Sequence, residues 1–296
     1  MSTADVEHRS LQVLAGYDGS PGAANAIEIA AHLVPTAAAQ VVHLWEPPFA
    51  VPQLRQRLVR EADTLERLID LLETEGRAEA DRLAGNGVAL ARAAGWEAEK
   101  LVQRSFGGDG YHFARLAEER AADLVVLGSR GLTGLQAVLG SVSDLVVHVS
   151  AVPVLVVPYP LTTRERSAAI AGPVLVATDG SPGAAHAAAG AASLFPGREV
   201  LTASVEVPGD PEVDPSALLD AGHIRLGCAG RPGSARAVAA ALADHAAERE
   251  AAVIVVGSRG RSASRELLLG SVAKALLHHA RCPVLVVPAG RPGPES

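Results

Sequence analysis

One stretch of the chain combines residue types that can hold a phosphate group. The apolar run Val253–Gly257 ends in glycine, Gly260 follows in a polar loop, and Gly270-Ser271 stands where an apolar-periodic helix is expected to begin. Glycines let backbone N–H groups come close to an anion, and the free N–H groups in the first turn of a helix attract negative charge. The stretch therefore predicts an anion-binding loop between a strand and a helix.

The same arrangement occurs earlier in the chain. The matching apolar run is Leu124–Gly128, Gly131 is the loop glycine, and Gly140-Ser141 is the matching helix start. Eight residues separate Gly131 from Gly140, whereas nine separate Gly260 from Gly270. Because the first loop is one residue shorter, its N–H groups could be aimed differently.

A second motif, Asp-Gly-Ser-Pro-Gly, follows an apolar run in each copy and begins at Asp18 and at Asp179. Serine is a good N-cap and proline fits the first position of a helix, so the motif predicts a helix start. Ligands of parallel sheets lie beyond the carboxyl ends of the strands. Both motifs are therefore expected to face one crevice, although Asp-Gly is also a common turn and the aspartates could serve only the turn.

Strand and helix patterns alternate through both copies, which predicts an α/β fold with parallel strands. Expected strands of the first copy cover residues 11–17, 40–45, 97–104, 124–127 and 152–157, and those of the second include 200–205, 223–228 and 253–256. The predicted organisation is a first domain over residues 1–160, a linker over 161–172 without apolar periodicity, a second domain over 173–290 and a tail over 291–296.

The copies differ in length between their first and fourth strands. Asp18 and Asp179 are 161 positions apart but Gly128 and Gly257 only 129, so the second copy is 32 residues shorter. Most of the difference corresponds to a long amphipathic helix predicted over residues 53–83, which could break near Gly76 and which a glycine cluster at 85–87 is expected to end.

Bulk properties exclude several classes of protein. A formal net charge of −7 argues against nucleic acid as a partner, and no apolar run approaches the length of a membrane span. The first residues do not have the pattern of a signal peptide, so a cytoplasmic location is expected. Cys228 and Cys282 give neither a disulfide framework nor a metal-site spacing, and no metal site is predicted.

Taken in order, three elements resemble the universal stress protein family in its tandem form, over nearly the whole chain. They are the Asp-Gly-Ser-Pro-Gly turn, the Gly-x2-Gly-x9-Gly-Ser loop and a closing strand, Cys282–Pro288, that repeats Val152–Pro158. The first loop departs from this pattern by its missing residue. The resemblance implies two tandem Rossmann-like domains, each with a five-stranded parallel sheet of order 3-2-1-4-5 flanked by helices. In the family's nucleotide-binding branch it also implies ATP, with or without Mg²⁺, as the ligand.

The resemblance also gives roles to single residues of the second half. Asp179 would meet the nucleoside, Ala177 and Val205 would line the adenine pocket, and the loop glycines would hold ribose and phosphates. The complete implied ATP site consists of Ala177, Asp179, Val205, Val256, Gly257, Gly260, Gly270, Ser271 and Val272 in the second half, and Gly16, Asp18, Leu44, Leu127, Gly128, Gly131, Gly140, Ser141 and Val142 in the first.

The motifs favour binding over catalysis. Neither a Walker lysine motif nor a Gly-x-Ser-x-Gly elbow is present, and no carboxylate beyond the two aspartates stands ready to activate water. We therefore predict a stress-response protein with ATP as a regulatory ligand and without catalytic residues. The alternatives are a slow ATPase or nucleotidyl-transfer enzyme at the same site, a cyclic AMP binder, and a nucleotide-free scaffold.

The closing strands are apolar and, in the family's strand order, lie at sheet edges. Bare edges of this kind promote aggregation. We expect the two halves to cover them by pairing as an intramolecular pseudo-dimer, and whole chains to pair again as a homodimer.

Overall fold

A computed structural model describes residues 10–46, 52–129, 139–207, 222–228, 234–260 and 269–289. The first half contains β1 (Leu11–Gly16), α1 (Pro21–Leu33), β2 (Ala37–Trp45), α2 (Pro52–Glu61), α3 (Leu65–Ala93), β3 (Glu97–Arg104), α4 (Asp109–Glu119), β4 (Leu124–Gly128), α5 (Ser141–Val149) and β5 (Val154–Val157). After α6 (Thr163–Ala171), the second half contains β6 (Val174–Ala177), α7 (Pro182–Leu194), β7 (Val200–Val205), β8 (His223–Leu226), α8 (Ala235–Glu248), β9 (Val253–Gly257), α9 (Ser271–His279) and β10 (Val284–Val287).

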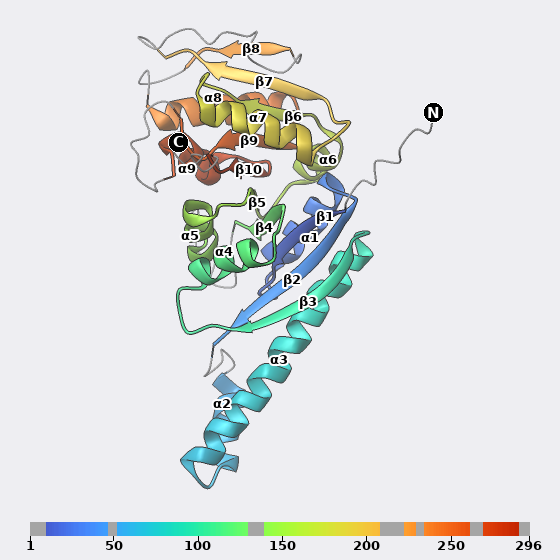
Figure 1. The fold of residues 1–296 in the computed structure, drawn as a ribbon, viewed down its shortest axis with the longest axis vertical. Coiled ribbons are helices and arrows are strands. Elements are labelled where there is room, and N and C mark those ends of the chain that lie inside the picture. Colours follow the sequence, from blue (N-terminus) through green and yellow to red (C-terminus); the bar gives the residue numbers. More distant parts are fainter. Residues whose placement is uncertain are drawn as a thin grey trace, which may run out of the picture.

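All these strands join in one ten-stranded sheet of order β3-β2-β1-β4-β5-β10-β9-β6-β7-β8 (Figure 1). Neighbouring strands within each half are parallel, and each half has the order 3-2-1-4-5. The two halves meet where β5 pairs antiparallel with β10, with Leu155 opposite Leu285. The predicted α/β fold, its strand order and the pairing of the closing strands are confirmed.

The long helix differs from its prediction. It is divided at residues 62–64, where the Thr64 hydroxyl accepts a hydrogen bond from the Arg67 N–H (3.2 Å) and caps α3. From there α3 continues without a break through Gly76 and through the glycines at 85 and 87. Gly87 is needed for close packing, because a Cβ there would lie 2.7 Å from Val41 Cγ1. The expected break and the expected end of the helix were therefore both wrong.

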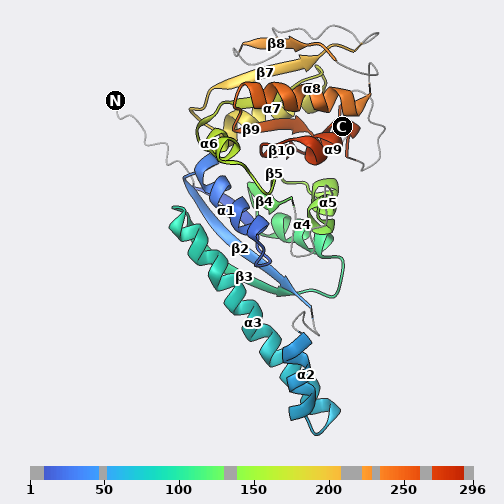
Figure 2. The same cartoon turned by 180° about the vertical axis from the view of Figure 1, so that it is seen from behind.

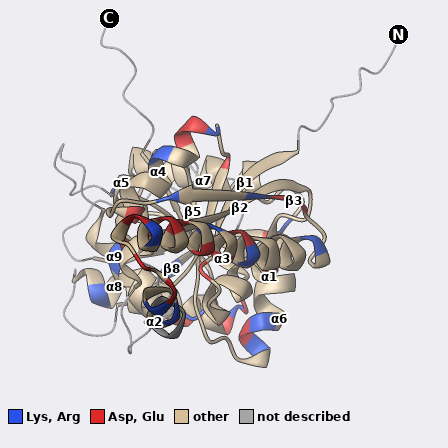
Figure 3. Ribbon diagram, turned by 90° about the horizontal axis from the view of Figure 1, so that it is seen from below, with Lys and Arg blue, Asp and Glu red and all other residues tan. Residues whose placement is uncertain are grey.

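Only the second part of α3 lies on the sheet. Its buried residues all fall between Gly76 and Ala91, and α2 with the beginning of α3 projects away from the body of the protein (Figures 1 and 2). We call this projection, residues 52–75, the arm. Charged residues of both signs follow one another along α3 (Figure 3). The sequence that replaces the arm in the second half includes residues 208–221, which lie outside the described part of the chain.

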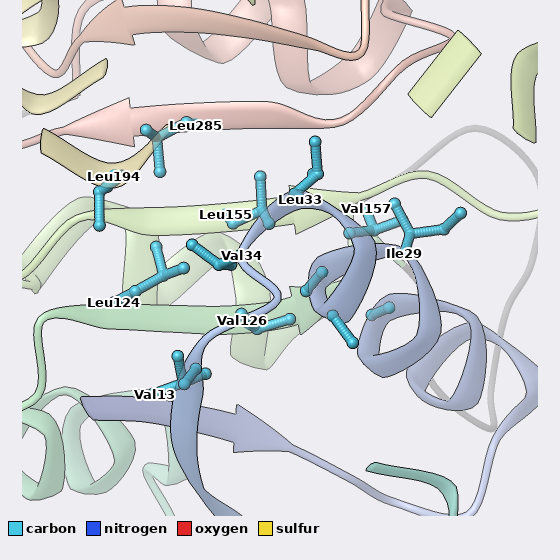
Figure 4. Packing of buried hydrophobic residues seen from close by; sticks show 14 of the residues in the cluster. Val13, Ile29, Leu33, Val34, Leu124, Val126, Leu155, Val157, Leu194 and Leu285 are labelled. Atoms are coloured by element: carbon cyan, nitrogen blue, oxygen red, sulfur yellow. The ribbon is translucent and has the colours of Figure 1, made fainter. Parts of the chain in front are cut away.

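Helices cover both faces of the sheet. On one face, Ile29 and Leu33 of α1 pack with the sheet residues Val126, Leu155 and Val157 (Figure 4). The same cluster continues into the second half and includes residues of α7 and β10. Burial of each such side chain contributes about 1.5–3 kcal/mol relative to exposure, so one continuous core holds the two halves together.

The other face carries α4, α5, α8 and α9, whose buried side chains form a second cluster with residues such as Leu14, Ile254 and Val286. Strands buried on both faces explain why the sequence shows continuous apolar runs here and not an alternating pattern. Among the described residues, no helix has both the length and the apolar character needed to cross a bilayer.

The predicted linker, 161–172, contains α6, a helix that apolar periodicity did not indicate. Thr162 and Glu165 form a capping box at its start. The Arg166 guanidinium donates to Asn25 Oδ1 (2.7 Å) and pairs with Glu28 (2.8 Å), both on α1. Only Ala169 of α6 is fully buried in the core, with Ile170 packed beside it, and Arg164 also pairs with Glu250 of the second half (2.9 Å). Polar contacts thus make up much of the contact of α6 with its neighbours, and so small an apolar contact leaves little periodic signal in the sequence.

Arg198, in the second half, reaches back across the junction. Its guanidinium donates to the carbonyl groups of Ile170 (2.9 Å) and Gly172 (3.1 Å) at the end of α6 and of His32 (2.9 Å) at the end of α1. Burial lowers the pKa of this arginine. Its charge satisfies carbonyl groups at two helix C-termini, where cations are favoured.

Candidate functional site

In the second half, the Asp-Gly-Ser-Pro-Gly motif forms a tight turn between β6 and α7. Asp179 Oδ1 accepts a hydrogen bond from the Ser181 N–H (3.0 Å), and Gly180 has a positive φ of 74°. The Ser181 hydroxyl accepts from the Ala184 N–H (3.2 Å) and caps α7, with Pro182 at its first position. Asp179 therefore serves the turn, as the Asp-Gly alternative expected. Its second carboxylate oxygen, Oδ2, faces a further part of the site.

That part is the glycine loop after β9. A Cβ added to Gly260 would lie 2.6 Å from Asp179 Oδ2, so only glycine lets the loop pass this close to the carboxylate. A Cβ on Gly257 would lie 2.6 Å from the Gly183 carbonyl oxygen, and one on Gly183 only 2.2 Å from that of Arg259. The two motifs meet at one edge of the sheet, as their positions after parallel strands predicted.

Gly183 was not among the predicted site residues. Its signal was present in the sequence, because it is the last residue of the Asp-Gly-Ser-Pro-Gly motif. The structure shows that it lets the start of α7 touch the backbone of the glycine loop.

The predicted helix start is also found at this edge. Helix α9 begins at Ser271 with Gly270 as N-cap, and no described side chain caps it. The Gly270 N–H donates to the Ser258 carbonyl (2.7 Å), which closes the loop at its base. The remaining N–H groups of the first turn carry the positive end of the helix dipole, the property that anion sites use.

Ser258 is a second residue that sequence reasoning missed. Its N–H donates to the Val287 carbonyl (2.7 Å), and its hydroxyl accepts from the Ala289 N–H (3.0 Å). The base of the loop is thus fixed to the end of β10, the strand that joins the two halves.

An apolar wall adjoins this polar edge. Ala177 and Val256 are buried, and the partly exposed Val205 and Val272 pack against the same core cluster. Leu127 in the first half belongs to this cluster too, with Leu44 and Val142 packed against it. The apolar residues of the predicted ATP sites, among them Ala177 and Val205, which were predicted to line the adenine pocket, therefore lie together on the face that carries α8 and α9 in the second half and α4 and α5 in the first.

The first half repeats the geometry wherever it is described. Asp18 Oδ1 accepts from the Ser20 N–H (2.9 Å), and a Cβ on Gly128 would lie 2.9 Å from the Gly22 carbonyl oxygen. The Gly140 N–H donates to the Ser129 carbonyl (2.8 Å), and no described side chain caps α5, which starts at Ser141. Gly131, in the shorter loop, lies outside the described residues.

The surroundings of the two aspartates differ. Tyr17 precedes Asp18, and its pKa is raised by burial and by the adjacent carboxylate. The Tyr17 carbonyl accepts a hydrogen bond from His43 Nδ1 (2.8 Å). At Gly16, a Cβ would lie 2.6 Å from Leu127 Cδ2, so this glycine makes room for a side chain that belongs to the predicted ATP site. In the second half Ala177 and Thr178 occupy the positions of Gly16 and Tyr17.

Comparison with known proteins identifies the family. The model of the "Universal stress protein family" matches residues 11–158 and 234–288. The chain belongs to the universal stress protein family. Its tandem organisation is visible in the two matched regions and in the repeated sheet order.

Similar universal stress proteins occur in several microorganisms. One from Mycobacterium tuberculosis is 33% identical over 239 residues, which are 72% of this chain and 77% of the relative. One from Bacillus subtilis is 30% identical over 149 residues, 49% of this chain and 97% of the relative. A crystal structure of a universal stress protein from Archaeoglobus fulgidus has a TM-score of 0.68 and 22% identity, and covers 95% of this chain and 100% of its own. The last likeness concerns the fold alone.

Proposed function

We propose that this universal stress protein binds adenine nucleotide, with ATP as the main ligand, at the carboxyl edge of the sheet and uses it as a regulatory ligand. The observation that carries the proposal is the meeting of Asp179, Gly260 and the start of α9 around one loop. Helix α9 offers N–H groups to phosphate, and the carboxylate offers acceptors to hydroxyl groups. The apolar wall nearby fits an aromatic base.

The glycines support this fit independently of the family. A Cβ at Gly257 would collide with the Gly183 carbonyl oxygen at the start of α7, and one at Gly260 with Asp179 Oδ2, so glycine keeps the loop close to both. ATP would bring a compact, highly charged polyphosphate, and N–H groups from glycine-rich backbone suit such a group better than bulky side chains do. Mg²⁺ would bind mainly to the phosphates of ATP, as is common for this ion. Among the described residues there is no group of three or more potential metal ligands.

Binding without fast turnover is part of the proposal. Around the described site we identify no histidine or further carboxylate in position to activate water, a role that nucleotide hydrolysis requires. We infer a role in the stress response, in the cytoplasm, in which nucleotide occupancy changes the interactions of the protein. A regulatory ligand must bind two states with different affinity to have this effect.

The test is the nucleotide content and stoichiometry of the purified protein. Mass spectrometry of the denatured protein identifies the bound nucleotide, and calorimetric titration with ATP and with cyclic AMP measures affinity and the number of sites. We expect ATP to bind, with loss of the second site in Gly270→Val and loss of the first in Gly140→Val. If no adenine nucleotide binds, the proposal is wrong and the alternative of a nucleotide-free scaffold replaces it.

Phosphate release from ATP separates the enzyme alternative from the binding proposal. We expect no release above that of a Gly140→Val, Gly270→Val double variant. Release that disappears with Asp179→Asn while ATP still binds would make the second site a slow ATPase.

A further inference from the structure

The arm has a surface that the other described residues do not cover. Helix α2 packs against the beginning of α3, and Leu58 between them is only 1% exposed. Over this length neither helix buries a residue against the sheet, because the buried residues of α3 begin at Gly76, and one ion pair, between Glu73 and Arg104 of β3 (2.8 Å), links the arm to the sheet edge. The two helices thus form a separate projection with its own small apolar contact.

Large apolar side chains remain exposed on this projection. Leu65 is 72% exposed, Val59 52% and Ile69 50%. They make up half of the six exposed large hydrophobic residues in the described part of the chain. Residues 65, 68, 69 and 72 of α3 are all leucine or isoleucine at the spacing of one helix face, and α2 covers only part of this stripe. Clustered exposed apolar residues of this kind mark interaction sites.

The charges of the arm indicate which kind of partner can bind it. Helix α2 contains three arginines and one glutamate, whereas residues 65–76 of α3 contain four acidic residues and one arginine. Arg60 and Glu66 are exposed, and neither has an ion-pair partner among the described residues. Several other charges of the arm are already paired, Arg57 with Glu61, Arg67 with Asp70 and Glu73 with Arg104 of β3. Arg60 on α2 and Glu66 on α3 are therefore the charges that would meet opposite charges in a second copy related by a two-fold axis.

We propose that the arm is the contact through which two copies of this chain form a dimer, with α2 of each copy against α3 of the other. The exposed Leu65 and Ile69 of both copies would then form the centre of a four-helix contact, with Arg60 of each α2 facing Glu66 of the other copy's α3 at its rim. This dimer uses a part of the first half that has no counterpart at the same position in the shorter second half. It does not depend on nucleotide binding.

The first test measures the mass of the full-length protein by light scattering over a dilution series. We expect a dimer for the natural chain, and for Ile69→Asp a dissociation constant at least about 100-fold higher, because each substitution counts twice in a two-fold interface. Leu90→Asp is the matched control, since Leu90 lies on the same helix, is 40% exposed and is outside the arm. It should remain dimeric.

The second test uses charge reversal. Arg60→Glu should weaken the dimer by placing like charges on both helices, and Glu66→Arg should do the same. When the two variants are mixed, each α2 again meets an α3 of opposite charge, so a heterodimer should form. Circular dichroism of each variant establishes that the helices are retained.

A chain that is monomeric at every concentration up to its solubility limit would overturn the proposal. A dimer that survives Ile69→Asp unchanged would overturn it as well, because the copies would then pair through another surface. The same holds if the mixed charge variants stay monomeric while each is folded.

Discussion

Two glycines of α3 should respond differently to the same substitution. Gly85 is exposed, and a Cβ there would meet no atom within 4 Å. Gly87 is buried, and its Cβ would lie 2.7 Å from Val41 Cγ1 and 2.8 Å from Tyr17 Cδ1. Alanine is about 1 kcal/mol better than glycine inside a helix, and this gain applies at both positions. Gly85→Ala should therefore raise the free energy of unfolding by about 1 kcal/mol.

At Gly87 the same gain is opposed by overpacking. Val41 is fully buried and Tyr17 is 8% exposed, so neither side chain can move into solvent. Forcing an extra methyl group into a packed core costs about 1–3 kcal/mol. Because the helix-propensity gain cancels between the two variants, Gly87→Ala should be less stable than Gly85→Ala by about this overpacking cost of 1–3 kcal/mol.

Urea-induced unfolding followed by circular dichroism measures both variants, and equal slopes against urea concentration justify comparing the free energies. The far-ultraviolet spectra of the folded variants should match that of the natural protein. If Gly87→Ala proves as stable as Gly85→Ala, α3 does not pack on β1 and β2 as described, and the account of why glycine occupies position 87 is refuted.

Three further predictions concern the site, the junction and the thiols. Gly260→Ala puts a Cβ 2.6 Å from Asp179 Oδ2 and should weaken ATP binding at the second site about tenfold or more; calorimetry showing an unchanged affinity would count against a nucleotide there. Arg198→Met removes the donors to three carbonyl groups and should lower the free energy of unfolding by about 2 kcal/mol. Urea-induced unfolding measures this change, and an unchanged free energy of unfolding would mean that the core alone holds the junction. Burial raises the pKa of the Cys282 thiol from 9.0 to about 12, so at pH 8 a disulfide reagent should modify the half-buried Cys228 alone and reach Cys282 only after denaturation. The same shift contributes stability that is present below pH 9.0 and is lost as the pH rises towards 12.

Buried strands were the easiest part of the fold to predict. The fourth strand was predicted over 124–127 and is found over Leu124–Gly128, with its four apolar residues buried. Apolar runs in a parallel sheet are buried on both faces, so their composition reports their environment directly. Helix α6 and the glycine-containing part of α3 could not be found in the same way. The contacts of α6 combine ion pairs of Arg166 and Arg164 with a single fully buried alanine, Ala169, a pattern without apolar periodicity. The cost of glycine in α3 is offset by packing on a strand more than forty residues away in the sequence.

The site was predictable in its outline. Repeated motifs after parallel strands must converge at one edge, and Asp179 and Gly260 do so. Gly183 and Ser258 were missed because their partners are backbone atoms of other segments, which no spacing rule reveals. The role of Asp179 and Gly260 in binding ATP stays a prediction.

The antiparallel contact of β5 with β10 has a consequence for how the two sites can differ. Because both strands belong to one chain, their pairing is intramolecular and does not depend on protein concentration. Two separate identical subunits joined in this way would have to carry identical loops. Within one chain, either half can change while its partner stays the same, and here one loop has eight residues between its glycines and the other nine. Every molecule thus contains one copy of each version, in a fixed ratio that no change in expression can alter.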